Sequence, residues 1–78
     1  MQTLLSLSDL KPGQSAKIER FLDEAMGVLR LQEMGLLPGT LVEVLRKAPW
    51  GGPIQIKVRG SLLSLRRSEA ALLSVLPA

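Results

Sequence analysis

Apolar and polar residues alternate along most of this chain, and glycine and proline interrupt the alternation at short intervals. The most regular stretch is 54–59, in which Ile54, Ile56 and Val58 share one face and polar or charged residues take the other. A period of two residues is typical of a half-buried β-strand. Weaker versions of the same pattern, with many aliphatic and β-branched residues, predict four more strands, at 15–22, 41–47, 62–66 and 72–76.

The period changes after residue 22, where apolar residues recur every three or four positions up to Met34. This spacing predicts an amphipathic helix, and Asp23 is suited to cap its start. Gly35 is placed to adopt a left-handed conformation just beyond the helix, so that Leu36 can contact Leu31 in a Schellman motif. The expected apolar stripe comprises Leu22, Met26, Val28, Leu29, Leu31 and Met34. Single helical turns are expected at 8–10 and 68–71.

Four turns are predicted from glycine and proline. The segments 11–14 and 37–40 each have proline second and glycine third, the pattern of a type II turn. The segment 49–53 is a hairpin connection whose two glycines are expected to supply unusual φ angles, and Gly60 with Ser61 makes a tight turn. The residues assigned structural roles in turns are Pro12, Gly13, Gly35, Pro38, Gly39, Gly51 and Gly52.

These elements predict a mainly β fold, with one short α-helix after the first strand and a single helical turn before the last. One short helix cannot cover the apolar face of a five-stranded sheet, so the sheet should curl on itself. A small, partly open SH3-like barrel is the expected architecture. The length of 78 residues predicts a single domain spanning residues 1–78.

The composition argues against most catalytic and metal chemistry. The chain has no Cys and no His, so thiolate sites, cysteine nucleophiles, imidazole ligands and the commonest general base are missing. The carboxylates are scattered, and Gly51-Gly52 is followed by Pro53 rather than by the Lys of a phosphate-binding loop. We therefore expect a non-enzymatic protein with no cofactor and no tight intrinsic metal site.

The net charge of +3 indicates a mild preference for acidic partners. Only two aromatic residues, Phe21 and Trp50, are available to stack on bases, so nucleic-acid binding is not expected. No apolar run approaches the roughly 20 residues that span a membrane, and the first residues lack the pattern of a signal peptide. A cytoplasmic location is expected.

A few residues are candidates for partner binding. Trp50 lies in the predicted hairpin connection, where it either forms an exposed anchor or folds back over one end of the barrel. Leu37 lies in a turn that could leave it exposed. A third candidate is a basic face shared by neighbouring strands, although a solvated strand face explains the same pattern. Its residues are Arg46, Lys47, Lys57, Arg59, Arg66 and Arg67.

The segment 31–40 resembles the central signature of the FeoA family, and the segments 10–13, 53–60 and 63–70 follow the family's order. The resemblance extends from about residue 7 to residue 75. It implies an SH3-like barrel that acts beside FeoB, a membrane permease with a cytosolic G-protein domain. Fe2+ would then be handled by the permease, and the present chain would be peripheral to the membrane through that partner.

Other functions are compatible with the same residues. The barrel resembles the C-terminal domain of iron-dependent repressors, which implies a metal-responsive regulatory domain, and small barrels also bind RNA or peptides. An accessory protein beside a G-protein could insert an arginine to stabilise the transition state, for which Arg30, Arg66 and Arg67 are the candidates. Open edge strands would also permit a homo-oligomer.

Overall fold

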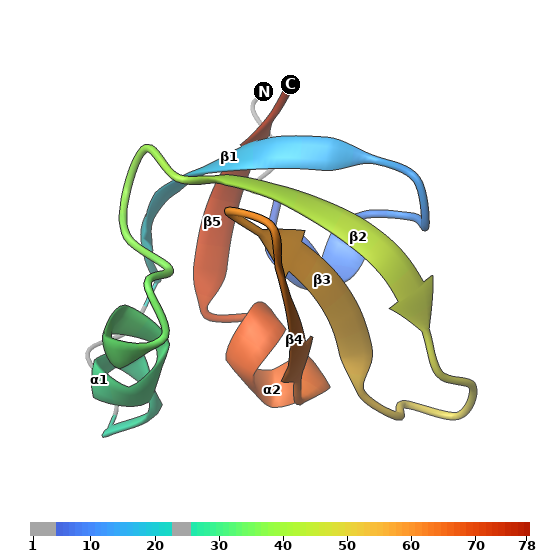
Figure 1. Ribbon diagram of the computed structural model, residues 1–78. Helices are drawn as coiled ribbons and strands as arrows, with labels where there is room; N and C mark the ends of the chain where they lie inside the picture. The colour runs from blue at the N-terminus through green and yellow to red at the C-terminus, as the bar shows by residue number, and fades with distance from the viewer. Residues whose placement is uncertain (1–4, 23–25) are drawn as a thin grey trace.

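The computed structural model describes residues 5–22 and 26–78, and it contains five strands, two α-helices and a 3-10 turn (Figure 1). All five predicted strands are confirmed, and so are the two short helical turns. The predicted helix cap at Asp23 lies outside the described residues. In chain order the elements are η1 (Leu7–Asp9), β1 (Ser15–Phe21), α1 (Met26–Glu33), β2 (Leu41–Lys47), β3 (Ile54–Val58), β4 (Ser61–Leu65), α2 (Arg67–Ala70) and β5 (Leu73–Pro77).

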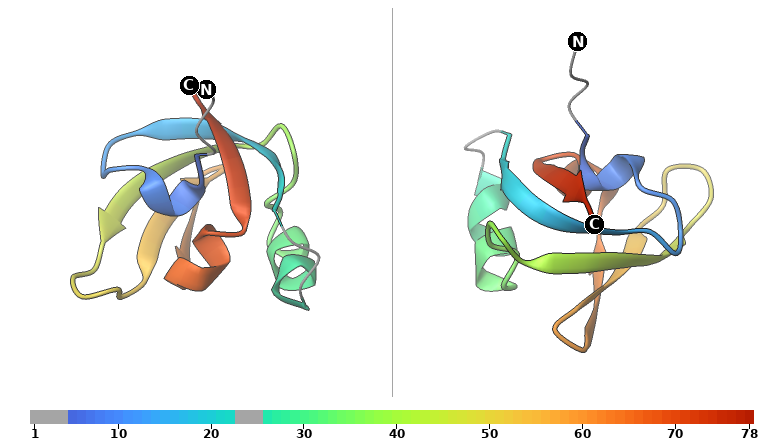
Figure 2. Two further views of the ribbon diagram at one scale, coloured as in Figure 1. Left: turned by 180° about the vertical axis from the view of Figure 1, so that it is seen from behind. Right: turned by 90° about the horizontal axis from the view of Figure 1, so that it is seen from above.

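The strands form one antiparallel sheet in the order β4-β3-β2-β1-β5. The register of β1 shifts between Ile18 and Arg20, and that of β2 shifts between Val44 and Arg46. Each shift inserts one extra residue, and such bulges bend a strand and increase its twist. The sheet therefore curls, as Figures 1 and 2 show, but β4 and β5 do not pair. The predicted SH3-like fold with a partly open barrel is confirmed.

The core fills the concave side of the curled sheet. Ile54, Ile56 and Val58 are buried, as their alternation predicts, and they pack with inward residues of the other strands. Leu7 and Leu10 close the barrel from the η1 side, and aliphatic residues flanking and within the helices complete it. The remaining buried apolar residues are Ala16, Ile18, Leu31, Leu36, Val42, Val44, Leu65, Ala70, Leu73 and Val75.

The end of α1 follows the predicted motif closely. Gly35 has φ of 88°, the Leu36 N–H donates to the Leu31 carbonyl at 3.0 Å, and the Gly35 N–H donates to the Gln32 carbonyl at 3.0 Å. These are the two hydrogen bonds of a Schellman motif. Leu31 and Leu36 are both fully buried, so the helix stop also brings two leucines into the core.

The predicted apolar stripe of the helix is partly wrong. Leu29 is 62% exposed, whereas Leu31 is buried. Successive helical residues are 100° apart, so Leu29 and Leu31 lie about 200° apart and cannot share a face. Leu22 is also exposed, because β1 ends at Phe21 and the bulge before Arg20 changes which side chains face the core.

The two turns that precede β1 and β2 are as predicted, but both hairpin connections differ from expectation. Within the β2–β3 connection, Trp50 and Gly51 have the positive φ angles, 54° and 74°, whereas Gly52 does not. Gly52 is instead required by close packing, since an added Cβ would lie 2.7 Å from the Ala48 Cβ. The β3–β4 turn consists of Arg59 and Gly60, at 50° and 81°, so Arg59 lies in the turn and not at the end of a strand.

Candidate partner-binding surface

Trp50 stands at the tip of the β2–β3 hairpin and is 98% exposed. The sequence left open whether Trp50 is exposed or folds back over one end of the barrel, and the structure shows that it is exposed. Its φ of 54° is unusual for a bulky residue, because the left-handed region crowds Cβ against the backbone. Strained backbone of this kind is concentrated at functional sites, and exposed tryptophan is enriched among residues that dominate protein interfaces.

The hairpin that carries Trp50 is held at its base by two cationic side chains. The Lys47 ammonium donates to the Ser8 carbonyl at 2.8 Å and to the Leu10 carbonyl at 3.0 Å. The Arg67 guanidinium donates to the Ala48 carbonyl at 3.0 Å. The loop is thus tied to η1 on one side and to α2 on the other, so Trp50 is presented on a fixed support.

The outer face of β2, β3 and β4 contains part of the predicted basic face. Arg46, Gln55 and Ser64 are cross-strand neighbours on this exposed face. They line a shallow groove of about 210 Å³ with Ala48 and Pro53, at the base of the Trp50 hairpin. The groove is open and combines a cation with hydroxyl and amide groups.

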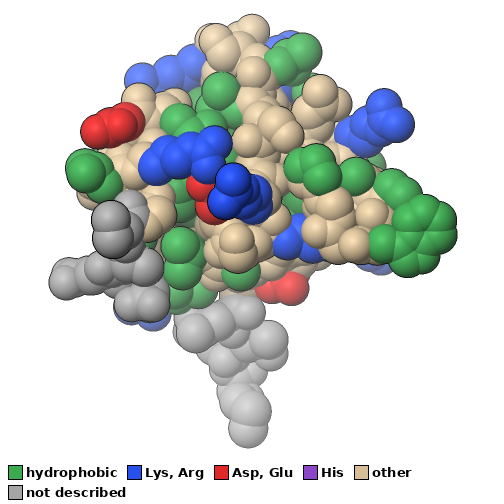
Figure 3. Space-filling model, turned by 90° about the horizontal axis from the view of Figure 1, so that it is seen from below, with side chains coloured by type: hydrophobic (Ala, Val, Ile, Leu, Met, Phe, Trp, Pro, Cys, Tyr) green, Lys and Arg blue, Asp and Glu red, His purple; other side chains and the backbone are tan. Residues whose placement is uncertain are grey.

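Lys57 and Arg59 line a second shallow groove of about 190 Å³, farther along the same strands. Glu43 is the cross-strand partner position of Lys57 and lies in this groove as well. The outer face is therefore mixed in charge at this end and positive near Arg46. Figure 3 views the molecule from below, the side on which α1, α2 and the β2–β3 hairpin lie in Figure 1, and shows Lys and Arg side chains next to an acidic one there, with hydrophobic side chains at one edge.

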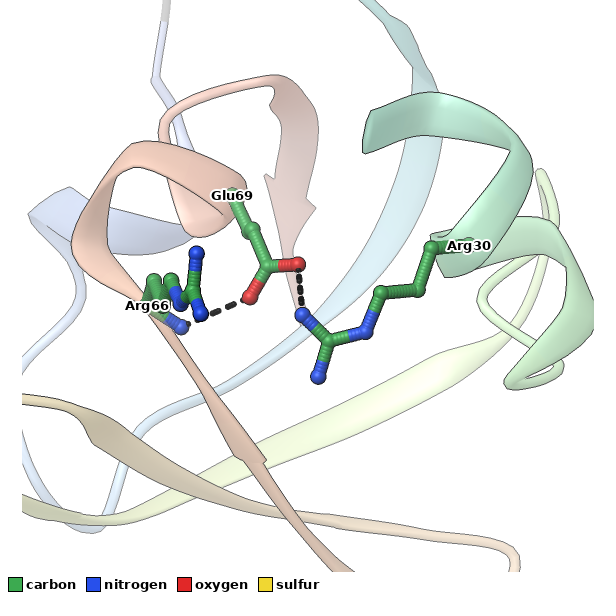
Figure 4. Close-up of polar contacts among 3 residues, drawn as sticks. All are labelled: Arg30, Arg66 and Glu69. Atoms are coloured by element: carbon green, nitrogen blue, oxygen red, sulfur yellow. Dashed lines mark hydrogen bonds and ion pairs between the residues drawn. The ribbon is translucent and has the colours of Figure 1, made fainter. Parts of the chain in front are cut away.

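Glu69 is the acidic group that sequence reasoning missed. The scattered carboxylates of the sequence offered no reason to single it out, but it is 7% exposed and accepts two hydrogen bonds. One comes from the Arg30 guanidinium at 2.5 Å and the other from the Arg66 backbone N–H at 2.9 Å (Figure 4). A glutamate three residues after the start of a helical turn is the signal that could have revealed it, because it can reach back to that backbone N–H.

The three arginines considered for G-protein catalysis have different surroundings. Arg30 pairs with Glu69, and Arg67 bonds to the Ala48 carbonyl and is half-buried. Arg66 has an exposed side chain next to the end of β4. Two of the three are thus engaged in holding the fold, and Arg66 is the one that faces solvent.

Leu37 is 41% exposed but lies in the turn before β2, whereas Trp50 follows the other end of that strand. A seven-residue strand is about 23 Å long. The structure therefore does not bring the two apolar candidates together. The compact part of the predicted surface consists of Trp50 and the groove lined by Arg46, Gln55 and Ser64.

Within residues 5–22 and 26–78, no three acidic residues lie close enough together to hold a metal ion. In the same part of the chain, no helix has the length and apolarity needed to cross a membrane. The lack of a tight metal site remains a prediction.

The curled five-stranded sheet and its exposed hairpin define a small SH3-like β domain. The sequence model of the FeoA domain matches residues 5–77, and the chain belongs to the FeoA family.

Several solved structures have the same fold over nearly the whole chain. A FeoA-like protein from Clostridium acetobutylicum is 31% identical, with a TM-score of 0.88 over 99% of this chain and 90% of that one. The FeoA of Stenotrophomonas maltophilia is 32% identical, with a TM-score of 0.81 over 92% and 89%. That protein was crystallised with zinc and is described as an SH3-domain protein and a candidate ferrous iron transport activating factor.

A manganese-dependent transcriptional repressor is also similar, with a TM-score of 0.89 over all of this chain. The present chain spans only 38% of that repressor, and the two are 16% identical. This likeness is one of fold alone.

Proposed function

We propose that this chain is a non-enzymatic, cytoplasmic accessory protein of ferrous-iron uptake that binds the cytosolic portion of an FeoB-like permease. Membership of the FeoA family supports a role in this transport system. The description of the Stenotrophomonas relative as a candidate ferrous iron transport activating factor points in the same direction. The proposed mechanism is protein–protein interaction, with Fe2+ carried by the permease.

The single observation that carries the proposal is the presentation of Trp50. The side chain is 98% exposed and its backbone is strained, and neither property benefits an isolated domain. Two cationic side chains nevertheless hold the hairpin in place. A rigid apolar anchor beside a polar groove is the usual composition of an interface hot spot, since little conformational entropy is lost when it is buried.

The proposal is tested by calorimetry of the purified chain with the cytosolic G-protein portion of its cognate permease. Wild type is expected to bind, and Trp50→Ala is expected to weaken binding by about tenfold or more, as loss of an anchor does. Leu29→Ala is the matched control, because Leu29 is also an exposed apolar residue but lies on α1. Equal affinities for wild type and Trp50→Ala would remove Trp50 from the interface. No binding by wild type would contradict the proposed function.

A further inference from the structure

β4 is an edge strand whose outer side is unpaired in the part of the chain that the structure describes. It lies at one end of the sheet and pairs only with β3. The right panel of Figure 2 shows the β3–β4 hairpin projecting away from the rest of the sheet. The other edge strand, β5, is partly covered, because Val75 donates its N–H to the Leu5 carbonyl at 2.9 Å and Ser74 pairs with Ser6.

The backbone groups available at this edge follow from the turn. Val58 and Ser61 flank a two-residue turn, so they form a hydrogen-bonded pair. Antiparallel pairs alternate between hydrogen-bonded and non-hydrogen-bonded types. Leu62 and Ser64, which face Lys57 and Gln55, therefore direct their N–H and C=O groups away from β3.

This edge lacks the usual protection against pairing. Natural edge strands commonly carry lysine, proline or a bulge that discourages strand addition. β4 has the sequence Ser-Leu-Leu-Ser-Leu, without charge or proline, and its register with β3 is continuous. Leu62 is 62% exposed on the outer face. The strand is thus suited to pairing with another extended segment.

The charges at both ends of β4 indicate which kind of extended segment can pair with this strand. Arg59 lies in the turn before the strand and Arg66 follows it directly, and both are exposed. A second copy of β4 paired antiparallel would place the Arg59 end of each strand beside the Arg66 end of the other, which is repulsive. A segment with carboxylates near its ends would meet opposite charge at the same two places.

We propose that the outer edge of β4 binds an extended acidic peptide segment by β-strand addition. The backbone of the segment pairs with Leu62 and Ser64, and its terminal carboxylates lie near Arg59 and Arg66. The assignment of this segment to the permease rests on the proposed function. The docking edge itself is inferred from the unpaired backbone groups of β4 and the arginines at its ends.

Two probes separate these claims. The first is a seven-residue peptide of alternating Thr and Val with Glu at both ends, compared with the same peptide carrying Lys at both ends. Binding to the isotopically labelled chain is followed by NMR, with hydrogen exchange measured at Leu62 and Ser64. We expect both amides to become protected, and the acidic peptide to bind roughly tenfold more tightly than the basic one.

The second probe is the G-protein portion of the permease, titrated with wild type, Ser64→Pro and Ser64→Ala. Proline removes an outward N–H that β3 does not use, so affinity should fall about tenfold. Alanine keeps this N–H and removes only the hydroxyl that lines the groove beside Trp50, so Ser64→Pro should bind about tenfold more weakly than Ser64→Ala. The dispersion of the NMR spectrum shows whether Ser64→Pro is folded, and if it is not, amide protection in wild type decides the result.

The outcomes distinguish a failure of the docking edge from a failure of the proposed function. Protection of Leu62 and Ser64 by the acidic peptide without any binding of the permease portion supports the edge and overturns the proposed function. Permease binding that leaves these amides unprotected and tolerates Ser64→Pro overturns the edge and keeps the function. Protection of the two amides that depends on protein concentration, without any probe, would favour a second copy of this chain as the occupant. Protection by a single-stranded RNA instead of the peptide would favour RNA. Either result overturns the proposal.

Discussion

Glu69 in α2 and Arg30 in α1 are 39 positions apart in the chain, yet their side chains form an ion pair at 2.5 Å. The same carboxylate accepts the backbone N–H of Arg66 at 2.9 Å. Glu69 thus joins the two helices to each other and to the end of β4. Its side chain is 9% exposed, whereas that of Arg30 is 53% exposed, so the two partners contribute unequally to stability.

Removing Glu69 is expected to destabilise the fold more than removing Arg30. Glu69→Ala leaves the Arg66 N–H without its acceptor and should lower the free energy of unfolding by about 2 kcal/mol. Arg30→Ala leaves a carboxylate that still accepts one hydrogen bond, and solvent screens the lost pair, so less than about 1 kcal/mol is expected. Urea unfolding followed by circular dichroism measures both, with exposed Glu33→Ala as control. Equal losses in the two variants would refute this ranking.

Gly52→Ala is expected to destabilise the hairpin through a steric clash and not through its φ angle. The new Cβ would lie 2.7 Å from the Ala48 Cβ and 3.2 Å from the Pro49 carbonyl oxygen. Overpacking of this kind costs about 1–3 kcal/mol. A double-mutant cycle with Ala48→Gly should recover part of the loss, because it removes the nearer atom. Strictly additive losses would mean that the two positions do not interact.

Replacing Trp50 is expected to separate stability from binding. Trp50→Gly removes the left-handed strain at φ of 54° and should raise stability by roughly 1 kcal/mol, or several degrees in Tm. Trp50→Ala keeps a Cβ at the same φ and should unfold like wild type. Both variants should lose affinity for the permease portion. A fall in Tm of several degrees in Trp50→Ala would show that the side chain packs on the domain after all.

Metal binding by the isolated chain is expected to be weak. The sequence has neither Cys nor His, and carboxylate oxygens alone suit hard cations better than Zn2+ or Fe2+. Titration with Zn2+, and with Fe2+ under anaerobic conditions, should show no saturable binding at micromolar metal and no change in Tm. A clear rise in Tm with either ion would favour the metal-responsive function instead.

The sequence predicts features that depend on neighbouring residues. The alternation around Ile56 identifies β3, and the spacing of Leu31, Gly35 and Leu36 defines the end of α1. Both follow from local geometry, namely the two-residue period of a strand and the hydrogen bonds of a Schellman motif.

Features that depend on distant partners were missed. The bulges at Glu19 and Leu45 are set by the pairing of whole strands, and the one at Glu19 contributes to the exposure of Leu22. The alternation of residues 54–59 places Arg59 in the strand, whereas the pairing of β3 with β4 places it in the turn. The sequence pattern does not contain this register. The burial of Glu69 depends on Arg30, which lies in another element, so no pattern within α2 predicts the pair.

The proposed role of this chain is to support ferrous-iron uptake through its exposed hairpin. The most direct measurement is the rate of Fe2+ uptake by cells that lack the chain but retain the permease, complemented with wild type or Trp50→Ala at equal protein levels. Wild type should restore uptake, and Trp50→Ala, which is expected to fold normally, should leave it near the level of the deletion. Unchanged uptake in the deletion strain itself would contradict the account.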